Sequence, residues 1–167
     1  MLFRSWTFEK RTDGAFNIKN VGANAYLDPS ASYDKQVKLV GTAPKAGWKV
    51  EYSNTLELYI IRSGSTCELN TTTKEGYPVY NWYGGNTNAQ DRADAGWQWR
   101  FTDVTDIDIK EEPTPIKVVK GTAQEGAAEI VNGRTYTITN RQKNGTCYPL
   151  YADRKSTRLN SSHSSVS

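Results

Sequence analysis

The sequence predicts an all-β fold assembled from units of about 40 residues. Short runs of the chain alternate apolar and polar residues, as half-buried strands do. No stretch of useful length has the i, i+3, i+4 spacing of an amphipathic helix. Tryptophan also recurs in similar local patterns, and Trp6 and Trp48 are 42 residues apart. Together these features indicate a repeated β architecture in a chain of 167 residues.

The first strand of each unit is predicted from a shared template. An aromatic or apolar residue is followed two positions later by Ile, starting at Phe16, Leu58 and Tyr136. A glycine comes next in each segment, where a hairpin turn would need a positive φ: Gly22, Gly64 and Gly145. A short apolar segment then follows the turn. We therefore expect each unit to begin with a β-hairpin.

The last strand of each unit is predicted from its tryptophan. The patterns Ser5-Trp6, Gly47-Trp48 and Gly96-Trp97-Gln98-Trp99 each place a tryptophan two residues before an apolar residue. One unit cannot bury such an apolar face alone, so the units must share a core. We expect Trp6, Trp48 and Trp99 to lie in that core.

These motifs resemble the ricin-type β-trefoil, over about residues 1–104. The resemblance rests on the Leu27–Asp28 pair and on closing segments similar to the family's Gln-x-Trp. It implies a β-trefoil with repeats of about 40 residues. Residues 1–10 would be the last strand of a truncated N-terminal repeat, and residues 15–52 and 56–104 would be the next two repeats.

The rest of the chain is predicted to lie outside this unit. Residues 105–131 contain Pro113, Pro115 and a run of charge, as a linker does. Residues 132–152 would start a second β-repeat or domain. In the alternative, the segment from Tyr136 supplies the closing repeat of the same trefoil.

Residues 153–167 are interpreted as a non-native tail. Their first eleven residues read DRKSTRLNSSH, and one back-translation of them resembles a widely used sequencing-library adapter. The alternative is a Ser-rich disordered tail.

Charge and residue types exclude several classes of function. The chain has a net charge of +3, but residues 1–152 contain 18 Lys and Arg against 17 Asp and Glu. This balance gives no case for a nucleic-acid partner or an anionic membrane. No apolar stretch is long enough for membrane insertion, and no signal peptide is visible in this sequence.

Catalytic and metal sites are also not expected. The only histidine, His163, lies in the tail, which excludes triads and zinc sites that need His. The two cysteines are 80 residues apart and do not form a ligand cluster. Carboxylate pairs such as Asp91 with Asp94 lie in polar segments, where solvated charge is the ordinary outcome. We therefore predict no metal, no cofactor and no catalytic activity, although the chain would be an appendage of a carbohydrate-active enzyme.

The candidate binding site is the segment VYNWYGGNTN at residues 79–88. An aromatic ring can stack on the C–H face of a sugar, while amides bind its hydroxyl groups. The predicted sugar-binding residues in this segment are Asn81, Trp82, Tyr83 and Asn86.

The family resemblance adds two residues to the site. It implies that Trp82 is the binding aromatic and that Asn70 stands where the family has its binding Asp. In the earlier repeat the acid is Asp28, but Val40 stands at the aromatic position. In the structural alternative, Trp82 only packs against the fold and Asp28 starts a turn.

The predicted function is that of a non-catalytic, lectin-like carbohydrate-binding module from a larger secreted bacterial protein. Its partner would be a glycan, and it would be covalently linked to catalytic or adhesive domains. It would act outside the cell, at the cell surface or in the periplasm. The alternatives are a β-trefoil spacer without a ligand and a trefoil that binds protein. A solvent-facing Trp82 with Asn70 or Asn86 nearby favours sugar binding, a buried one favours the spacer, and a large exposed apolar patch favours a protein partner.

Overall fold

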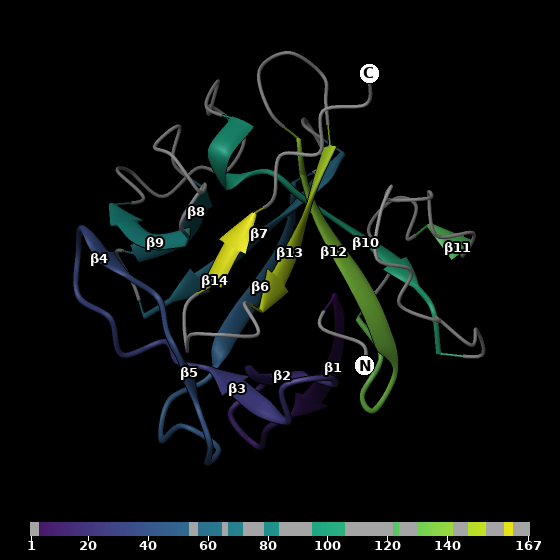
Figure 1. Cartoon of the computed structure of the whole chain (residues 1–167), viewed down its shortest axis with the longest axis horizontal. Helices are drawn as coiled ribbons and strands as arrows, with labels where there is room; N and C mark the ends of the chain where they lie inside the picture. The colour runs from purple at the N-terminus through teal and green to yellow at the C-terminus, as the bar shows by residue number, and fades with distance from the viewer. Residues whose placement is uncertain are drawn as a thin grey trace.

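The computed structural model of the chain describes residues 4–53, 57–64, 67–71, 79–83, 95–105, 122–123, 130–141, 147–152 and 159–161. These residues form an all-β structure in which every strand pairing is antiparallel (Figure 1). The predicted all-β class is thereby confirmed, and within the described residues the only helical element is the 3-10 turn η2 (Ala95–Trp97). The strands are β1 (Ser5–Lys10), β2 (Phe16–Asn20), β3 (Ala25–Leu27), β4 (Lys35–Gln36), β5 (Leu39–Val40), β6 (Trp48–Ser53), β7 (Leu58–Ser63), β8 (Cys67–Thr71), β9 (Val79–Tyr83), β10 (Trp99–Asp103), β11 (Thr122–Ala123), β12 (Thr135–Arg141), β13 (Cys147–Ala152) and β14 (Leu159–Ser161).

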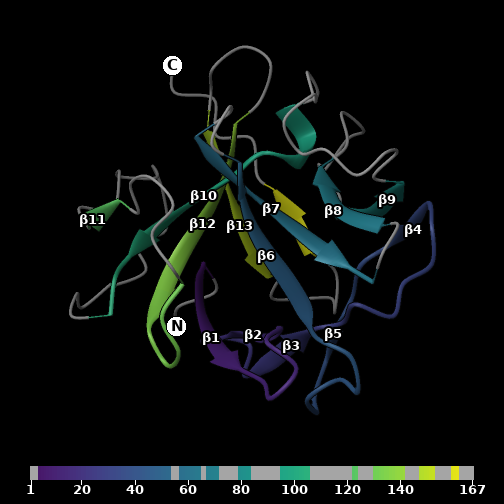
Figure 2. The same cartoon turned by 180° about the vertical axis from the view of Figure 1, so that it is seen from behind.

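Six strands pair in a closed ring. The order is β1, β2, β6, β7, β10, β12 and back to β1. The remaining described strands extend from this ring, among them the β8–β9 hairpin, and Figure 2 shows β6 and β7 side by side across the middle of the molecule. Each of the six strands therefore has a paired neighbour on both sides, and none of them is an edge strand of the ring.

Three tryptophans make the same hydrogen bond. The indole N–H of Trp48 donates to the carbonyl of Leu27 at 2.9 Å, and that of Trp99 donates to the carbonyl of Leu69 at 3.0 Å. The indole N–H of Trp6 donates to the carbonyl of Leu150 at 3.1 Å. All three indoles are fully buried, which confirms the prediction that they lie in the core. Each bond ties a ring strand to the second strand of a hairpin.

The strand register corrects the predicted template in one place. Each buried tryptophan lies directly opposite an aromatic residue of the neighbouring strand: Phe16 opposite Trp48, Tyr59 opposite Trp99, and Tyr136 opposite Trp6. The equivalent of Phe16 is therefore Tyr59, one residue after the predicted Leu58. Ile61 accordingly belongs to the core cluster with Ile18 and Ile138.

Aromatic rings fill the centre of the core. The Phe8 ring contacts the rings of Phe16, Phe101 and Tyr136 edge to face, with centroids 5.7, 5.4 and 5.4 Å apart. The Tyr59 ring meets Phe101 in the same way at 4.8 Å. This edge-to-face geometry is the one that aromatic pairs prefer. These five side chains come from five strands of the ring, so the cluster holds the ring together.

The segment 132–152 is part of the same sheet. Strand β12 lies between β1 and β10 and pairs with both. This pairing favours the alternative in which the segment from Tyr136 belongs to the same unit, over the start of a second domain. Of the predicted linker at 105–131, the structure describes residue 105, β11, which pairs with β10, and residues 130–131, of which Ile130 is buried.

The C-terminal segment contributes one described strand. Within residues 153–167, β14 pairs with β13 over three residues. The non-native origin of this segment stays a prediction, because a strand pairing carries no information about where the codons came from.

Candidate functional site

The β8–β9 hairpin places Trp82 on its outer face. Leu69 and Val79 point into the core, and neighbouring residues of a strand point to opposite faces. Trp82 lies directly opposite Glu68, and Tyr80 lies opposite Asn70, so these four residues share the outer face. Trp82 is half-buried there.

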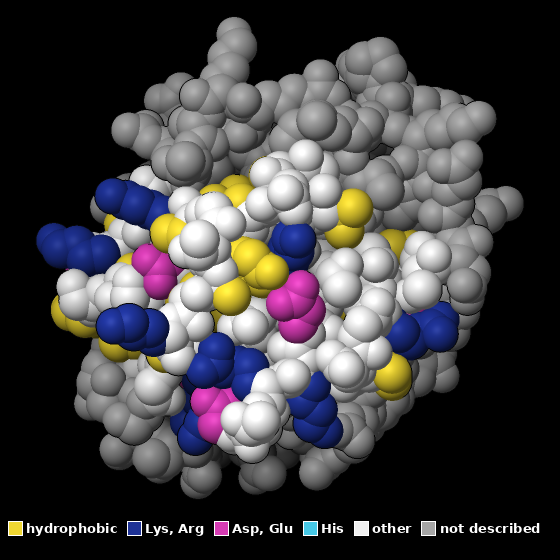
Figure 3. Space-filling model, turned by 90° about the horizontal axis from the view of Figure 1, so that it is seen from below, with side chains coloured by type: hydrophobic (Ala, Val, Ile, Leu, Met, Phe, Trp, Pro, Cys, Tyr) yellow, Lys and Arg dark blue, Asp and Glu magenta, His cyan; other side chains and the backbone are white. Residues whose placement is uncertain are grey.

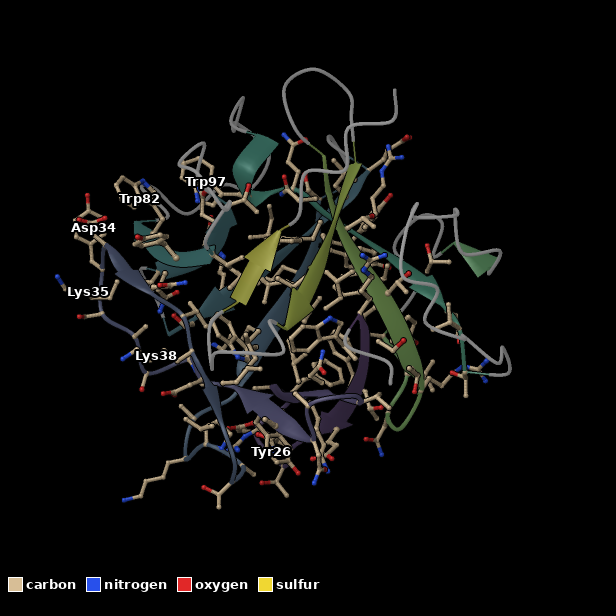
Figure 4. All side chains as sticks on the ribbon, viewed as in Figure 1. Tyr26, Asp34, Lys35, Lys38, Trp82 and Trp97 are labelled. Carbon is tan, nitrogen blue, oxygen red and sulfur yellow. The ribbon has the colours of Figure 1, made fainter. Side chains whose placement is uncertain are left out.

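Tyr33 packs against Trp82. The two ring centroids are 5.2 Å apart and the ring planes are tilted by 49°. Tyr33 is 52% exposed, one of three large apolar side chains exposed in the described part of the chain. Figure 4 shows Trp82 at the edge of the molecule, next to Asp34. The two rings form an aromatic surface, here called the Tyr33–Trp82 pair, that is open to solvent.

The loop before β4 holds Tyr33 and Asp34 in place. Lys35 of β4 pairs with Asn81 of β9, which brings Asp34 to the level of Trp82. The Asp34 N–H donates to the Asn81 carbonyl at 2.9 Å. Asp34 has a φ of 58°, in the left-handed region that Asp tolerates better than most residues. This backbone conformation leaves an exposed carboxylate beside the Tyr33–Trp82 pair.

Asn81 and Trp82 are neighbours in β9, so their side chains point to opposite faces of the strand. It is 1% exposed, and its amide group donates to the Ala31 carbonyl and to the Ser63 hydroxyl, both at 2.5 Å. The predicted sugar-binding role conflicts with this position, because the amide points inward and ties β9 to the loop at residues 29–31. Asn81 instead supports the loop that carries Tyr33.

Asn70 lies on the correct face but is covered. It is only 7% exposed, because η2 packs over β8. A Cβ atom on Gly96 would lie 2.5 Å from the Asn70 Oδ1 atom and 3.0 Å from the Thr71 carbonyl oxygen. Glycine at position 96 therefore allows the close approach that buries Asn70.

Asp28 is engaged in its own turn. Its carboxylate accepts the Ser30 N–H at 2.9 Å and the Ser30 hydroxyl at 2.7 Å. Both oxygens are thus bonded within a turn, as the structural alternative predicted. Of the remaining predicted residues, Asn86 and the side chain of Tyr83 lie outside the described part of the chain.

An ion pair lies beside Trp82 on the outer face. The Arg62 guanidinium is 3.2 Å from the Glu68 carboxylate and 3.1 Å from that of Glu51. The Glu68 side chain is 1% exposed and the Arg62 side chain is 12% exposed. The pair thus joins neighbouring residues of β7 and β8, at the position opposite Trp82.

Sequence reasoning missed Tyr33 and Asp34. They lie in the polar segment Ser30–Asp34, where no periodic pattern marks a strand. The available signal was an aromatic residue inside a loop-forming segment, because such a ring has few core positions to fill. The contact with Trp82 depends on the β4–β9 pairing, which joins segments more than 40 residues apart.

Metal and membrane sites do not appear in the described part of the chain. There, no three His, Cys, Asp or Glu side chains gather in a group that could hold a metal ion. Among these residues, too, no helix has the length and hydropathy needed to cross a membrane.

Comparison with known proteins gives no family assignment. No protein-family model matches the chain, and no curated protein or solved structure matches it significantly.

Proposed function

We propose that the chain is a β-trefoil of the ricin-type kind that binds carbohydrate without catalysis. Three features support the trefoil. The six-strand ring is closed, three tryptophans donate the same bond to three leucine carbonyls, and an aromatic residue stands opposite each tryptophan. In this proposal β1 is the fourth strand of the unit that β12 and β13 begin.

The Tyr33–Trp82 pair is the proposed sugar-binding surface. Its rings offer an apolar face for the C–H groups of a sugar ring. The exposed Asp34 carboxylate beside them supplies acceptors for hydroxyl groups. The single observation that carries the proposal is the contact of an exposed Tyr33 with a half-buried Trp82, because a purely structural ring would be expected inside the core.

The two alternatives fit the structure less well. A spacer without a ligand predicts a buried Trp82, whereas this side chain reaches solvent. A protein-binding trefoil predicts a contiguous apolar patch. In the described residues the exposed large apolar side chains are Val21, Tyr33 and Val131, which come from three different loops.

The biological setting follows from the resemblance. The module would belong to a larger secreted bacterial protein, linked to catalytic or adhesive domains, and would act outside the cell, at the cell surface or in the periplasm. It needs no cofactor. Weak binding to one glycan would gain through effective concentration when several modules are linked.

A glycan array followed by titration tests the proposal. The full chain should bind at least one oligosaccharide class, and Trp82→Ala should weaken that binding about tenfold, because it removes the stacking surface. The matched control is Val40→Ala. Val40 pairs with Tyr26 between β3 and β5, as Trp82 pairs with Glu68 between β8 and β9. The Val40→Ala variant should bind the glycan with unchanged affinity. A wild-type chain that binds no glycan, or equal affinity in the Trp82→Ala variant, would contradict the proposal.

A further inference from the structure

We propose that the glycan bound at the Tyr33–Trp82 pair is acidic, carrying carboxylate or sulfate groups that Lys35 and Lys38 recognise. This inference rests on the proposed function, and it adds the chemical class of the ligand. The two lysines are here called the lysine edge.

The lysine edge adjoins the aromatic surface. Lys35 follows Tyr33 and Asp34 directly and belongs to β4, the edge strand beside the strand of Trp82. It lies directly opposite Asn81, so its side chain starts from the other face of the sheet than Trp82 and reaches solvent at the sheet edge. Lys38 comes three residues later, between the buried Val37 and Leu39, so its side chain points away from the core. Figure 4 shows Trp82, Asp34, Lys35 and Lys38 in succession along one side of the molecule. A chain of sugar rings stacked on the aromatic pair would have to cross this sheet edge to meet both ammonium groups.

Both lysines are available to an anion. Each is exposed, and within the described residues neither side chain forms a hydrogen bond or an ion pair. Asp34 is the only acidic residue in segment 33–38, so that segment keeps a net charge of +1. A neutral sugar would use the Asp34 carboxylate and the rings, and would leave both ammonium groups without a partner.

Positive charge is concentrated in this part of the chain. Residues 11–50 contain six Lys and Arg and three Asp and Glu, whereas the rest of residues 1–152 contains twelve and fourteen. The face seen in Figure 3 shows Lys and Arg side chains spread more widely than Asp and Glu. This local excess would attract an anionic ligand even though the chain as a whole is nearly balanced.

The expected strength of the effect follows from the exposure of the lysines. An exposed ion pair contributes about 0.2–1 kcal/mol, so two of them correspond to roughly a twofold to thirtyfold preference for the charged ligand. Such pairs are screened by salt, since the Debye length falls from about 10 Å at 0.1 M to about 3 Å at 1 M. The preference should therefore shrink at high ionic strength.

Titration with ligands that differ only in charge tests the inference. An oligogalacturonate and its methyl ester share the same sugar rings, and a sulfated oligosaccharide and its desulfated form give the second pair. The full chain should bind the charged member of at least one pair more tightly at low salt. In Lys35→Gln/Lys38→Gln this preference should disappear while the neutral member binds as before.

The control is Lys45→Gln/Lys49→Gln, which removes the same charge from two other exposed lysines of segment 11–50. It should keep the preference. Equal binding of charged and neutral members by the wild type would overturn the inference and leave the proposed function standing. A preference that survives in the Lys35→Gln/Lys38→Gln variant would also overturn it. Failure to bind any of the four ligands or any other glycan would overturn both proposals.

Discussion

The indole N–H of Trp6 donates to the carbonyl oxygen of Leu150 at 3.1 Å, although 144 residues separate them in sequence. Trp48 and Trp99 make the same bond within 21 and 30 residues. Strand β1 is thus bonded to β13 in the way that β6 is bonded to β3 and β10 to β8. This contact is the main reason to group β1 with β12 and β13 in the proposed trefoil.

Trp6→Phe should destabilise the protein by about 1–3 kcal/mol. The substitution keeps a buried ring but leaves the Leu150 carbonyl without its donor. Trp48→Phe, which removes the matching bond to Leu27, is expected to have a similar effect. Urea unfolding followed by circular dichroism measures both. If Trp6→Phe left the free energy of unfolding unchanged while Trp48→Phe lowered it, β1 would not be an integral part of the ring.

Asn140→Ala should loosen η2 from the sheet. The Asn140 amide is fully buried and donates to the carbonyls of Gly96 and Gln98, at 3.0 and 2.9 Å. The substitution removes the donor to the buried Gln98 carbonyl and to the part-buried Gly96 carbonyl, which costs about 2 kcal/mol or more. Its half-buried neighbour Thr139 provides the control variant, Thr139→Ala. Unfolding free energies should fall for Asn140→Ala only, and equal values for both variants would rule out this role.

Arg62→Met should cost about 3–5 kcal/mol, because it removes the cationic group 3.2 Å from the nearly buried Glu68 carboxylate. Glu68→Gln should cost less, since Arg62 keeps its contact with the more exposed Glu51. Thermal unfolding of both single variants and of Arg62→Met/Glu68→Gln gives the coupling between the two groups. Additive effects in the double variant would show that the two side chains do not interact.

Asp103 should make stability depend on pH in the acid range. Burial raises the pKa of its carboxyl, but hydrogen bonds from Arg134 and Thr105 outweigh this and hold the pKa below the ordinary 3.8. The folded state thus binds a proton at Asp103 less readily than the unfolded chain. Its contribution is present above pH 3.8 and is lost as the pH falls through the lowered value.

Unfolding free energies measured from about pH 5 to about pH 2 check this sign. Asp103→Asn should show a smaller loss of stability in this interval than the wild type. Arg134→Met should flatten the curve in the same way, because Arg134 is the ion-pair partner. An unchanged acid slope in Asp103→Asn would assign the acid sensitivity to other carboxylates.

The sequence was sufficient to predict the β class, the core tryptophans and one of the turns. Gly64 has the predicted positive φ of 64°. In the turn that contains Gly22, by contrast, the described residue with a positive φ is Asn24, at 49°. Asn tolerates the left-handed region better than most residues other than Gly. The turn could therefore be predicted from the sequence, but not which of its residues has the positive φ.

The register of β7 could not be predicted, for a physical reason. Residues 58–61 are all apolar and all buried, so alternation does not distinguish one face from the other. A shift of the β7 register by one residue would turn Leu58 and Ile60 toward the core face in place of Tyr59 and Ile61. Only the pairing of Tyr59 with Trp99 resolves the choice.

The candidate site was predicted only in part. Trp82 could be proposed as a candidate because an aromatic residue beside amides and glycines is typical of sugar sites. The opposite orientation of Asn81 follows from strand alternation once β9 is assigned. Tyr33 and Asp34 could not be placed, because their position depends on a pairing between β4 and β9 that neither local sequence encodes.

The most direct test of the account is a glycan titration of the 15N-labelled protein, with the five tryptophan indole N–H signals followed by NMR. The Trp82 signal, assigned by its absence in Trp82→Phe, should shift progressively with ligand. The signals of Trp6, Trp48 and Trp99, whose protons are held by backbone carbonyls, should stay in place. A bound glycan that leaves the Trp82 signal unmoved would contradict the assignment of the site.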